Sequence, residues 1–240
     1  MENLRSMGRK NVYASFGCAS GLEEILPGVR THVLGPPTVR QHQAIRKQRA
    51  RDESEFWHLQ AAAGASAGNP LFRAAETWPV KKAPPHTRWF LHRMQSIAGE
   101  QALGIVRTLD RALNNTSLIL LFETGDKKLL FPGDAQIESW SYALSKPWVR
   151  QLLRSVDLYK VGHHGSLNAT PKSLWDLFEK RSTKSLKTIV STMAGKHGDA
   201  RSGTEVPRQK LVATLKAESC YFSTQSLGRE QLRQDFVIPL

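Results

Sequence analysis

The sequence predicts an α/β protein, because strand-like apolar runs and a stretch of helical periodicity occur in one chain. Two apolar runs within residues 117–131 flank the turn TGDKK and are typical of paired strands. Another strand-like run covers residues 156–161. Residues 94–113 place apolar side chains near helical spacing, which predicts a helix with one buried face. We therefore expect a sheet and helices around a shared core.

Length and composition are those of an ordinary globular protein. With 240 residues, 40% of them hydrophobic, the chain can bury one sizeable core or two small ones. It lacks both the roughly 18 to 20 continuous apolar residues of a spanning helix and the apolar segment of a signal peptide. We expect a cytoplasmic protein with no membrane partner. Cys18 and Cys220 predict neither a disulfide nor a Cys-based zinc site, and we expect both thiols to be buried.

Basic residues clearly outnumber acidic ones. The 34 Lys and Arg residues against 21 Asp and Glu give a net charge of +13, which favours contact with polyanions such as nucleic acid or a phosphorylated substrate. The densest run, RQHQAIRKQRAR at residues 40–51, predicts a basic helix. This helix suits a solvated surface as well as a phosphate-binding one. No nucleic-acid-binding motif interleaves aromatic residues with its charges.

The chain is predicted to form a single domain, 1–240, with three stretches. Residues 1–63 contain a strand at 29–34, stopped by Gly35 and two prolines, and then the basic helix. Residues 64–93 are rich in Ala, Gly, Ser and Pro, which indicates an irregular insertion or connection. Residues 94–240 contain the remaining elements and the segments that carry chemistry.

The segment FPGDA ends the second strand of the predicted pair. A carboxylate just beyond a buried strand, beside a glycine that admits close approach, suits a metal ligand at a sheet edge. Asp134 is equally suited to be a turn residue or the N-cap of a helix that we expect to start at Ala135. Both interpretations stay open at this point.

The segment KVGHHGS follows the strand expected at 156–161. It places His163 and His164 between two glycines, and neutral imidazole is a preferred ligand of zinc and similar metals. Adjacent side chains leaving a strand point to different sides, so one imidazole could bind metal while the other contacts substrate or a carboxylate. The alternative is a histidine pair that hydrogen-bonds a turn.

These segments together resemble a known family. The stretch NNTSLILLFETGDKKLLFPGDAQIESW, followed by LYKVGHHGSLNAT, is similar to the C-terminal half of metallo-β-lactamase-fold hydrolases, closest to the branch of the DNA-uptake competence domains and their stand-alone relatives. The segments TIVSTMAGKHGD, VPRQKLVATL and YFSTQSL resemble that branch's closing strand, loop, helix and strand. The resemblance implies an incomplete αββα sandwich, in which this chain holds one sheet complete and the other in part, with its N-terminal part missing.

The resemblance also implies a metal site. In the family, the Asp of the GDA segment bridges two metal ions and a His of the HHG segment completes the second site. The corresponding residues are Asp134 and one of His163 and His164, with His164 favoured as the ligand and His163 as the substrate-side partner. One or two ions of Zn, Mn or Fe are implied, with a metal-bound hydroxide that attacks a phosphoryl or carbonyl centre.

Three further residues are expected near an anionic substrate, either a small molecule or a phosphodiester. Lys160 and Ser166 border the HHG segment, and His197 lies in the loop that the family keeps near its active site. An exposed lysine and a turn serine are the simpler interpretations of the first two. His32 is expected to be a packed or surface residue of its strand.

One family feature is missing. The H-x-H-x-D-H cluster, the family's chief ligand set, does not occur in this sequence. Because catalytic zinc sites typically take about three protein ligands, we expect weak or no metal binding and little activity from this chain alone. Two hypotheses follow. The chain is a hydrolase, or a fragment of one, whose other half comes from a partner chain or an oligomer; or it is an inactive basic module that binds nucleic acid or protein. An incomplete sandwich would also expose an apolar face and favour association.

Overall fold

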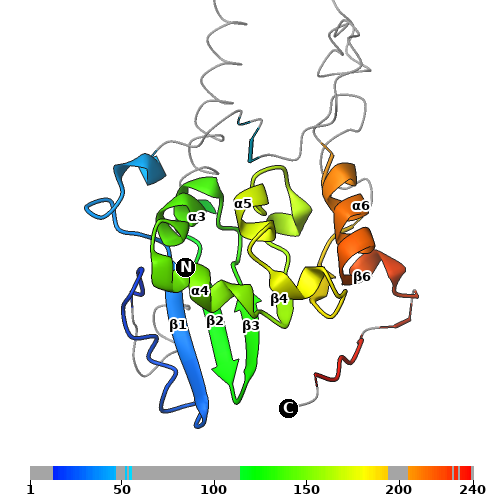
Figure 1. Ribbon diagram of the computed structural model, residues 1–240, viewed down its shortest axis with the longest axis horizontal. Helices are drawn as coiled ribbons and strands as arrows, with labels where there is room; N and C mark the ends of the chain where they lie inside the picture. The colour runs from blue at the N-terminus through cyan, green and yellow to red at the C-terminus, as the bar shows by residue number, and fades with distance from the viewer. Residues whose placement is uncertain are drawn as a thin grey trace, which may run out of the picture. The chain divides into compact units, whose positions relative to one another are not determined.

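The central element of the computed structural model is a six-stranded mixed sheet (Figure 1). The structure describes residues 13–46, 52, 54–55, 114–193, 205–228, 230–231 and 233–238, which all belong to one compact unit. The strands follow one another in the sheet in chain order: β1 (Val29–Gly35), β2 (Ile119–Thr124), β3 (Lys127–Phe131), β4 (Leu158–Lys160), β5 (Lys187–Val190) and β6 (Cys220–Ser223). The α/β prediction is therefore confirmed, as are the strand pair around Gly125 and the strands expected near 29–34 and 156–161.

Strand direction divides the sheet into two parts. β1 pairs with β2, and β2 with β3, in antiparallel register, whereas β3, β4, β5 and β6 are parallel neighbours. Antiparallel neighbours need only a short turn, and Gly125, with φ +57°, lies in the turn between β2 and β3. Parallel neighbours need a crossover, and helices form the crossovers from β3 to β4 and from β5 to β6. The helices are α3 (Ile137–Leu144), α4 (Pro147–Arg154), α5 (Lys172–Trp175) and α6 (Gln209–Glu218).

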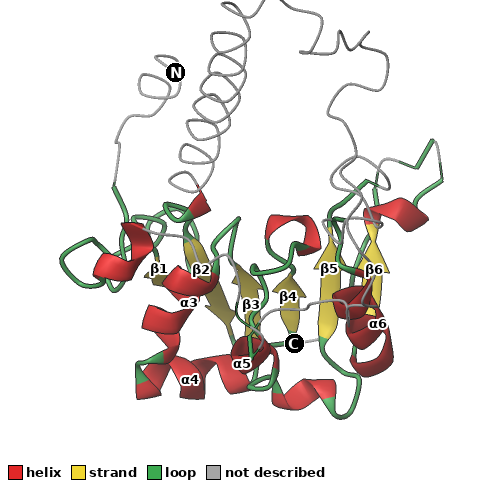
Figure 2. Ribbon diagram, turned by 90° about the horizontal axis from the view of Figure 1, so that it is seen from above, coloured by secondary structure: helices red, strands yellow, loops and turns green. Residues whose placement is uncertain are grey.

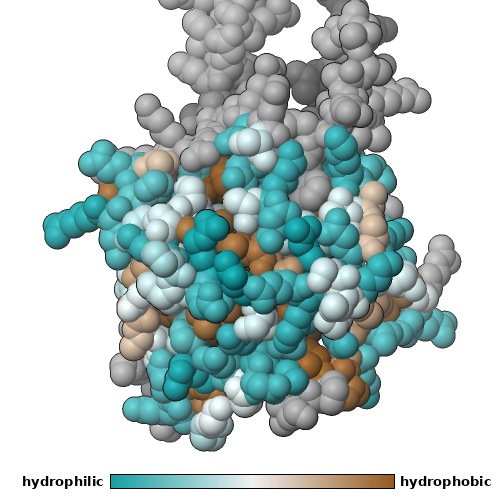
Figure 3. Space-filling model, in the orientation of Figure 1, coloured by the Kyte–Doolittle hydropathy of each residue, from teal (hydrophilic) through white to brown (hydrophobic). Residues whose placement is uncertain are grey.

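These four helices cover one face of the sheet, as Figure 2 shows. In α3 the buried side chains include Ile137, Trp140 and Ala143, and in α4 they are Val149 and Leu153. The spacing of three or four residues places each set on one side of its helix. The outer surface over these helices is mainly hydrophilic, with small separate hydrophobic areas (Figure 3). Amphipathic helices therefore seal this face of the sheet from water.

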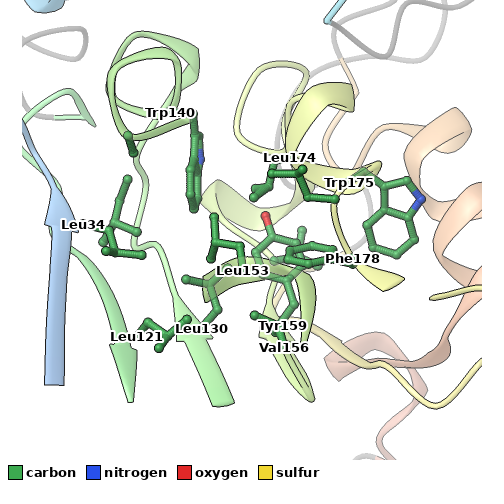
Figure 4. Packing of buried hydrophobic residues seen from close by; sticks show 14 of the residues in the cluster. Leu34, Leu121, Leu130, Trp140, Leu153, Val156, Tyr159, Leu174, Trp175 and Phe178 are labelled. Carbon is green, nitrogen blue, oxygen red and sulfur yellow. The ribbon is translucent and has the colours of Figure 1, made fainter. Parts of the chain in front are cut away.

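The core lies between the sheet and this helix layer (Figure 4). From the sheet it contains Leu34, Leu121, Leu130 and Tyr159. Because side chains alternate along a strand, these residues share one face of the sheet. Trp140 from α3 packs in the same cluster and is fully buried. Full burial of a large aromatic side chain contributes about 1.5–3 kcal/mol from transfer alone, so this layer stabilises the fold strongly.

Polar atoms of two core aromatic residues bind the loop that follows the HHG segment. The Trp140 indole N–H donates to the carbonyl oxygen of Ala169 at 3.2 Å. The Tyr159 hydroxyl shares a hydrogen bond of 2.8 Å with Thr170 Oγ1, and burial raises the pKa of this phenol well above its usual range. Buried Trp and Tyr need such partners, so the loop is joined to the core at two successive residues.

Asp157 immediately precedes β4 and connects β3, β4 and β5 at the end of the sheet away from the HHG segment. Its carboxylate accepts the Lys128 backbone N–H at 2.9 Å, and its own N–H donates to the Lys128 carbonyl at 2.9 Å. The Lys187 N–H donates to the Asp157 carbonyl at 2.8 Å, and Lys180 forms an ion pair with the carboxylate. Because β4 is only three residues long, these bonds extend its pairing with β3 and β5.

Several expectations differ from the structure or fall outside it. Residues 40–42 are not helical, and the described part of the basic run holds only the 3-10 turn Gln43–Arg46. Neither cysteine is fully buried as expected: Cys18 is partly buried, and Cys220 is exposed because it begins the edge strand β6. Both thiols are free. The predicted helix at 94–113, the connection at 64–93 and most of the basic run lie outside the described residues. None of the described helices is long and apolar enough to cross a membrane.

Replacing Asp157 by Ala is expected to lower the free energy of unfolding by about 2–3 kcal/mol, because charge-assisted hydrogen bonds to a backbone N–H and an ammonium group are lost together. Chemical denaturation measures this change. Asp126→Ala is the matched control, since that side chain is 74% exposed and pairs only with its neighbour Lys127. The control should leave stability nearly unchanged, because water screens an exposed ion pair. Equal losses in both variants would contradict the role of Asp157.

Candidate functional site

The described site residues gather along the edge formed by the C-terminal ends of three parallel strands. Asp134 follows β3, His163 and His164 follow β4, and Ser191 follows β5. In open α/β sheets, ligands bind outside the carboxyl ends of the parallel strands. The segments FPGDA and KVGHHGS, some thirty residues apart in sequence, thus reach the same edge because β3 and β4 are adjacent and parallel.

A backbone hydrogen bond joins the two loops directly. The His163 N–H donates to the Gly133 carbonyl at 3.2 Å. A Cβ atom at Gly162 would lie 3.1 Å from that carbonyl oxygen and 3.5 Å from Ala169 Cβ, so glycine permits this close approach. Gly133 itself has φ +56°, a conformation that L-residues rarely adopt. Gly162 therefore lets the two loops touch, whereas a Cβ atom at Gly133 would meet Leu118 and Ser117 at 3.3 Å.

The HHG segment has an unusual backbone. His163, His164 and Gly165 have φ values of +42°, +55° and +79°. The left-handed region costs an L-residue roughly 1–2 kcal/mol, and only the glycine adopts it freely. Two successive strained histidines persist only where surrounding contacts hold them, and such strain is concentrated at functional sites.

The two imidazoles lie close to each other but have different hydrogen-bond partners. Their ring centroids are 6.3 Å apart and the rings are inclined by 54°. The exposed His164 donates its Nδ1–H to the Ser191 carbonyl at 2.6 Å. His163 Nδ1 lies 3.1 Å from Ser166 Oγ, which in turn lies 3.5 Å from Asn168 Oδ1. If Ser166 donates to Asn168, then His163 donates through Nδ1 as well.

This pattern of hydrogen bonds has a chemical consequence. A histidine that donates Nδ1–H carries its lone pair on Nε2. Metal-ligating histidines commonly donate their other ring N–H to an oxygen, which fixes the tautomer and the orientation of the ring. His164 meets this condition through the Ser191 carbonyl, which can only accept, whereas the Ser166 hydroxyl beside His163 Nδ1 can either donate or accept.

Asp134 lies in a turn rather than at a helix cap. The Ala135 N–H donates to the Pro132 carbonyl at 3.1 Å, and Asp134 lies within this turn. The helix α3 starts two residues later than expected, at Ile137, with Gln136 as its N-cap residue and no side-chain capping bond. The N-cap interpretation is therefore wrong and the turn interpretation is confirmed.

Lys160 accompanies Asp134 at this edge. It is partly buried rather than exposed, and its Nζ donates to the Val161 carbonyl at 3.2 Å. Burial lowers the pKa of the Lys160 amine, and the nearby Asp134 charge opposes that change. A partly desolvated ammonium beside a carboxylate can attract an anionic group. His197, the other residue expected to contact substrate, lies outside the described residues.

His32 belongs to a different cluster. It lies on β1, and its Nε2 is 3.0 Å from the Glu123 carboxylate on β2. This hydrogen bond, assisted by the charges of Lys128 and Arg30, lowers the pKa of Glu123 even though desolvation opposes the change. His32 is thus a packed residue of its strand, as expected.

The donor set does not amount to a complete metal site. In the described part of the chain, no three side chains of His, Cys, Asp or Glu gather closely enough to hold a metal ion. Catalytic zinc typically needs about three protein ligands. The described residues therefore do not fit the implied metal by themselves.

Comparisons with protein-family models, with curated proteins and with solved structures found no match to this chain. The resemblance to metallo-β-lactamase-fold hydrolases thus rests on the quoted segments alone.

Two groups at the site could not be found from the sequence. The Ser191 carbonyl reaches His164 only because β5 lies beside β4, and a backbone oxygen leaves no sequence signal. Asn168 lies two residues after Ser166, and only the path of the loop shows that it faces the serine hydroxyl.

Because His164 has a left-handed backbone, we expect a glycine variant at this position to be more stable than an alanine variant, the reverse of the order in an ordinary helix. His164→Gly should be more stable than His164→Ala by about 1 kcal/mol, because both lose the bond to Ser191 but only glycine relieves the strain. Thermal and urea unfolding of the two variants measure the difference. In α6, Ala213→Gly should instead lose about 1 kcal/mol, as in an ordinary helix. A less stable glycine variant at 164 would contradict the strain.

Proposed function

We propose that this chain is part of a metal-dependent hydrolase of the metallo-β-lactamase type that acts on a phosphoester or another anionic substrate. Asp134 and His164 would be ligands, and His163, with Lys160, would face the substrate. The observation that carries the proposal is the hydrogen bond between the His163 N–H and the Gly133 carbonyl, which brings the FPGDA and KVGHHGS loops together at one sheet edge.

The orientation of the imidazoles supports this proposal. A turn that merely needed a polar partner would not require two strained histidines whose Nδ1 atoms both face oxygens. Lys160 supports an anionic substrate, because it places an amine group at the end of β4, next to the HHG segment. The net charge of +13 acts in the same direction by attracting anions over a longer range.

The incomplete ligand set limits what the described residues can do. A working site would need donors from residues outside the described ranges, where the sequence has His58, His86, His92 and His197, or from a second chain. We derive no catalytic step from the described residues alone. Because the ligand set is incomplete, we expect the isolated chain to bind metal weakly.

The second face of the sheet supports an αββα sandwich. This face carries Leu120 and Phe122 from β2 and their cross-strand partners Phe131 and Leu129 from β3. Phe131 is 38% exposed, and α3 to α6 all lie on the opposite face. An apolar sheet face is stable in water only when another layer packs on it. We propose that a second sheet, from this chain or a partner chain, covers this face.

The metal proposal is tested by titrating zinc into the metal-free chain and measuring the binding at equilibrium by isothermal titration calorimetry. Asp134→Ala and His164→Ala should each weaken binding by at least the roughly 10- to 100-fold seen for substitutions around metal sites. His32→Ala is the control and should bind as the wild type does, because His32 lies in a separate cluster. Wild-type zinc binding that is undetectable at equilibrium, or that neither Asp134→Ala nor His164→Ala weakens, would overturn the proposal.

A second candidate function is an inactive basic module that binds nucleic acid. The excess of 34 basic over 21 acidic residues, together with the incomplete ligand set, favours it. If it is correct, binding of a mixed-sequence oligonucleotide should fall steeply with salt, and Asp134→Ala should leave it unchanged. Fluorescence anisotropy measures this binding. Undetectable binding at about 50 mM salt would exclude this function.

A further inference from the structure

A buried ion pair lies against the HHG segment. Arg208 and Glu205 are 6% and 7% exposed, and Arg208 Nη1 lies 3.0 Å from Glu205 Oε2. The other carboxylate oxygen of Glu205, Oε1, is buried and has no hydrogen-bond partner among the described residues. Placing two charges away from water with one oxygen unsatisfied generally costs more than packing two apolar side chains of similar size.

Helix formation does not explain the arginine either. Arg208 is the N-cap residue of α6, a position that favours Ser, Thr, Asp or Asn. A cation at this end of a helix also opposes the helix dipole, and the first turn of α6 has no acidic residue to offset it. Neither local helix stability nor burial therefore accounts for the pair.

The contacts of this segment point to the HHG loop. The Arg208 N–H donates to the Gly165 carbonyl at 2.9 Å. A Cβ atom at Gly165 would lie 3.0 Å from Pro207 Cβ, so Pro207 packs closely against the loop. Gly165 ends the run of left-handed residues that begins at His163. The segment from Glu205 to Arg208 thus contacts the strained loop at the point where it returns to an ordinary conformation.

We propose that Glu205 and Arg208 are positioning residues that hold His163 and His164 in their strained conformation. The ion pair fixes the segment 205–208, so that the Arg208 N–H and Pro207 hold Gly165 in place. The histidine backbone then cannot relax, and the imidazoles keep their bonds to Ser191 and Ser166. The importance of this role for binding rests on the function proposed above, but the positioning itself can be measured without metal or substrate.

The test is the tautomer state of the two histidines in metal-free full-length protein, measured by 15N NMR at about pH 8, where ordinary imidazoles are neutral. In the wild type, the Nδ1–H form should dominate at His164. In Arg208→Met, the ratio of the Nδ1–H to the Nε2–H tautomer of His164 should fall by about fivefold. This factor corresponds to the free energy of one typical hydrogen bond. Arg208→Lys keeps a cation opposite Glu205 and should restore the wild-type signals.

Arg208→Met leaves the Glu205 charge unpaired and could fail to fold, so Glu205→Gln combined with Arg208→Met is the second variant. Without buried charges it should fold, yet still show the altered histidine signals. Unchanged histidine signals in this double variant, or a wild type without the Nδ1–H form at His164, would overturn the proposal. Failure of the wild type to bind zinc would overturn the proposed function and leave this result intact.

Discussion

The close contact between two loops, at Gly133 and at Gly162–His163, is the constraint on which the site depends. The hydrogen bond from the His163 N–H to the Gly133 carbonyl requires a glycine at 162, because a Cβ atom there would lie 3.1 Å from the same oxygen. Asp134 immediately follows Gly133, and His164 immediately follows His163, so this contact fixes the carboxylate and the imidazoles relative to each other. A larger side chain at Gly162 would separate the loops and with them the candidate ligands.

Burial makes that contact rigid. The loop after the HHG segment is hydrogen-bonded to Trp140 and Tyr159, both of which are fully buried between the sheet and its helices. On the far side, the segment before α6 binds Gly165 through the Arg208 N–H. Two histidines can therefore remain in a left-handed conformation that would relax in a mobile loop. The packing of the core therefore also maintains the geometry of the site.

Patterns in the sequence predicted the strands around Gly125 and the strand before the HHG segment, because these depend on alternation and on glycine chemistry over a few residues. Predictions that depended on where a helix begins were less accurate. The start of α3 was placed two residues too early, so Asp134 was considered as a cap that it does not form. Lys160 was considered an exposed lysine, although burial at the end of β4 changes its surroundings.

The sequence by itself determined which residue types stand at the strand ends, since this is a local property, whereas the left-handed backbone of His163 and His164 depends on contacts from the rest of the fold. Only the tertiary structure decided that the ends of β3, β4 and β5 form a common edge, because the order of strands in a sheet depends on long-range pairing. For the same reason, it alone revealed the Ser191 carbonyl beside His164 and the ion pair of Glu205 and Arg208 behind Gly165. These partners lie about 27 or more positions from the HHG segment in the sequence. Sequence periodicity relates only residues that are a few positions apart, so it cannot predict them.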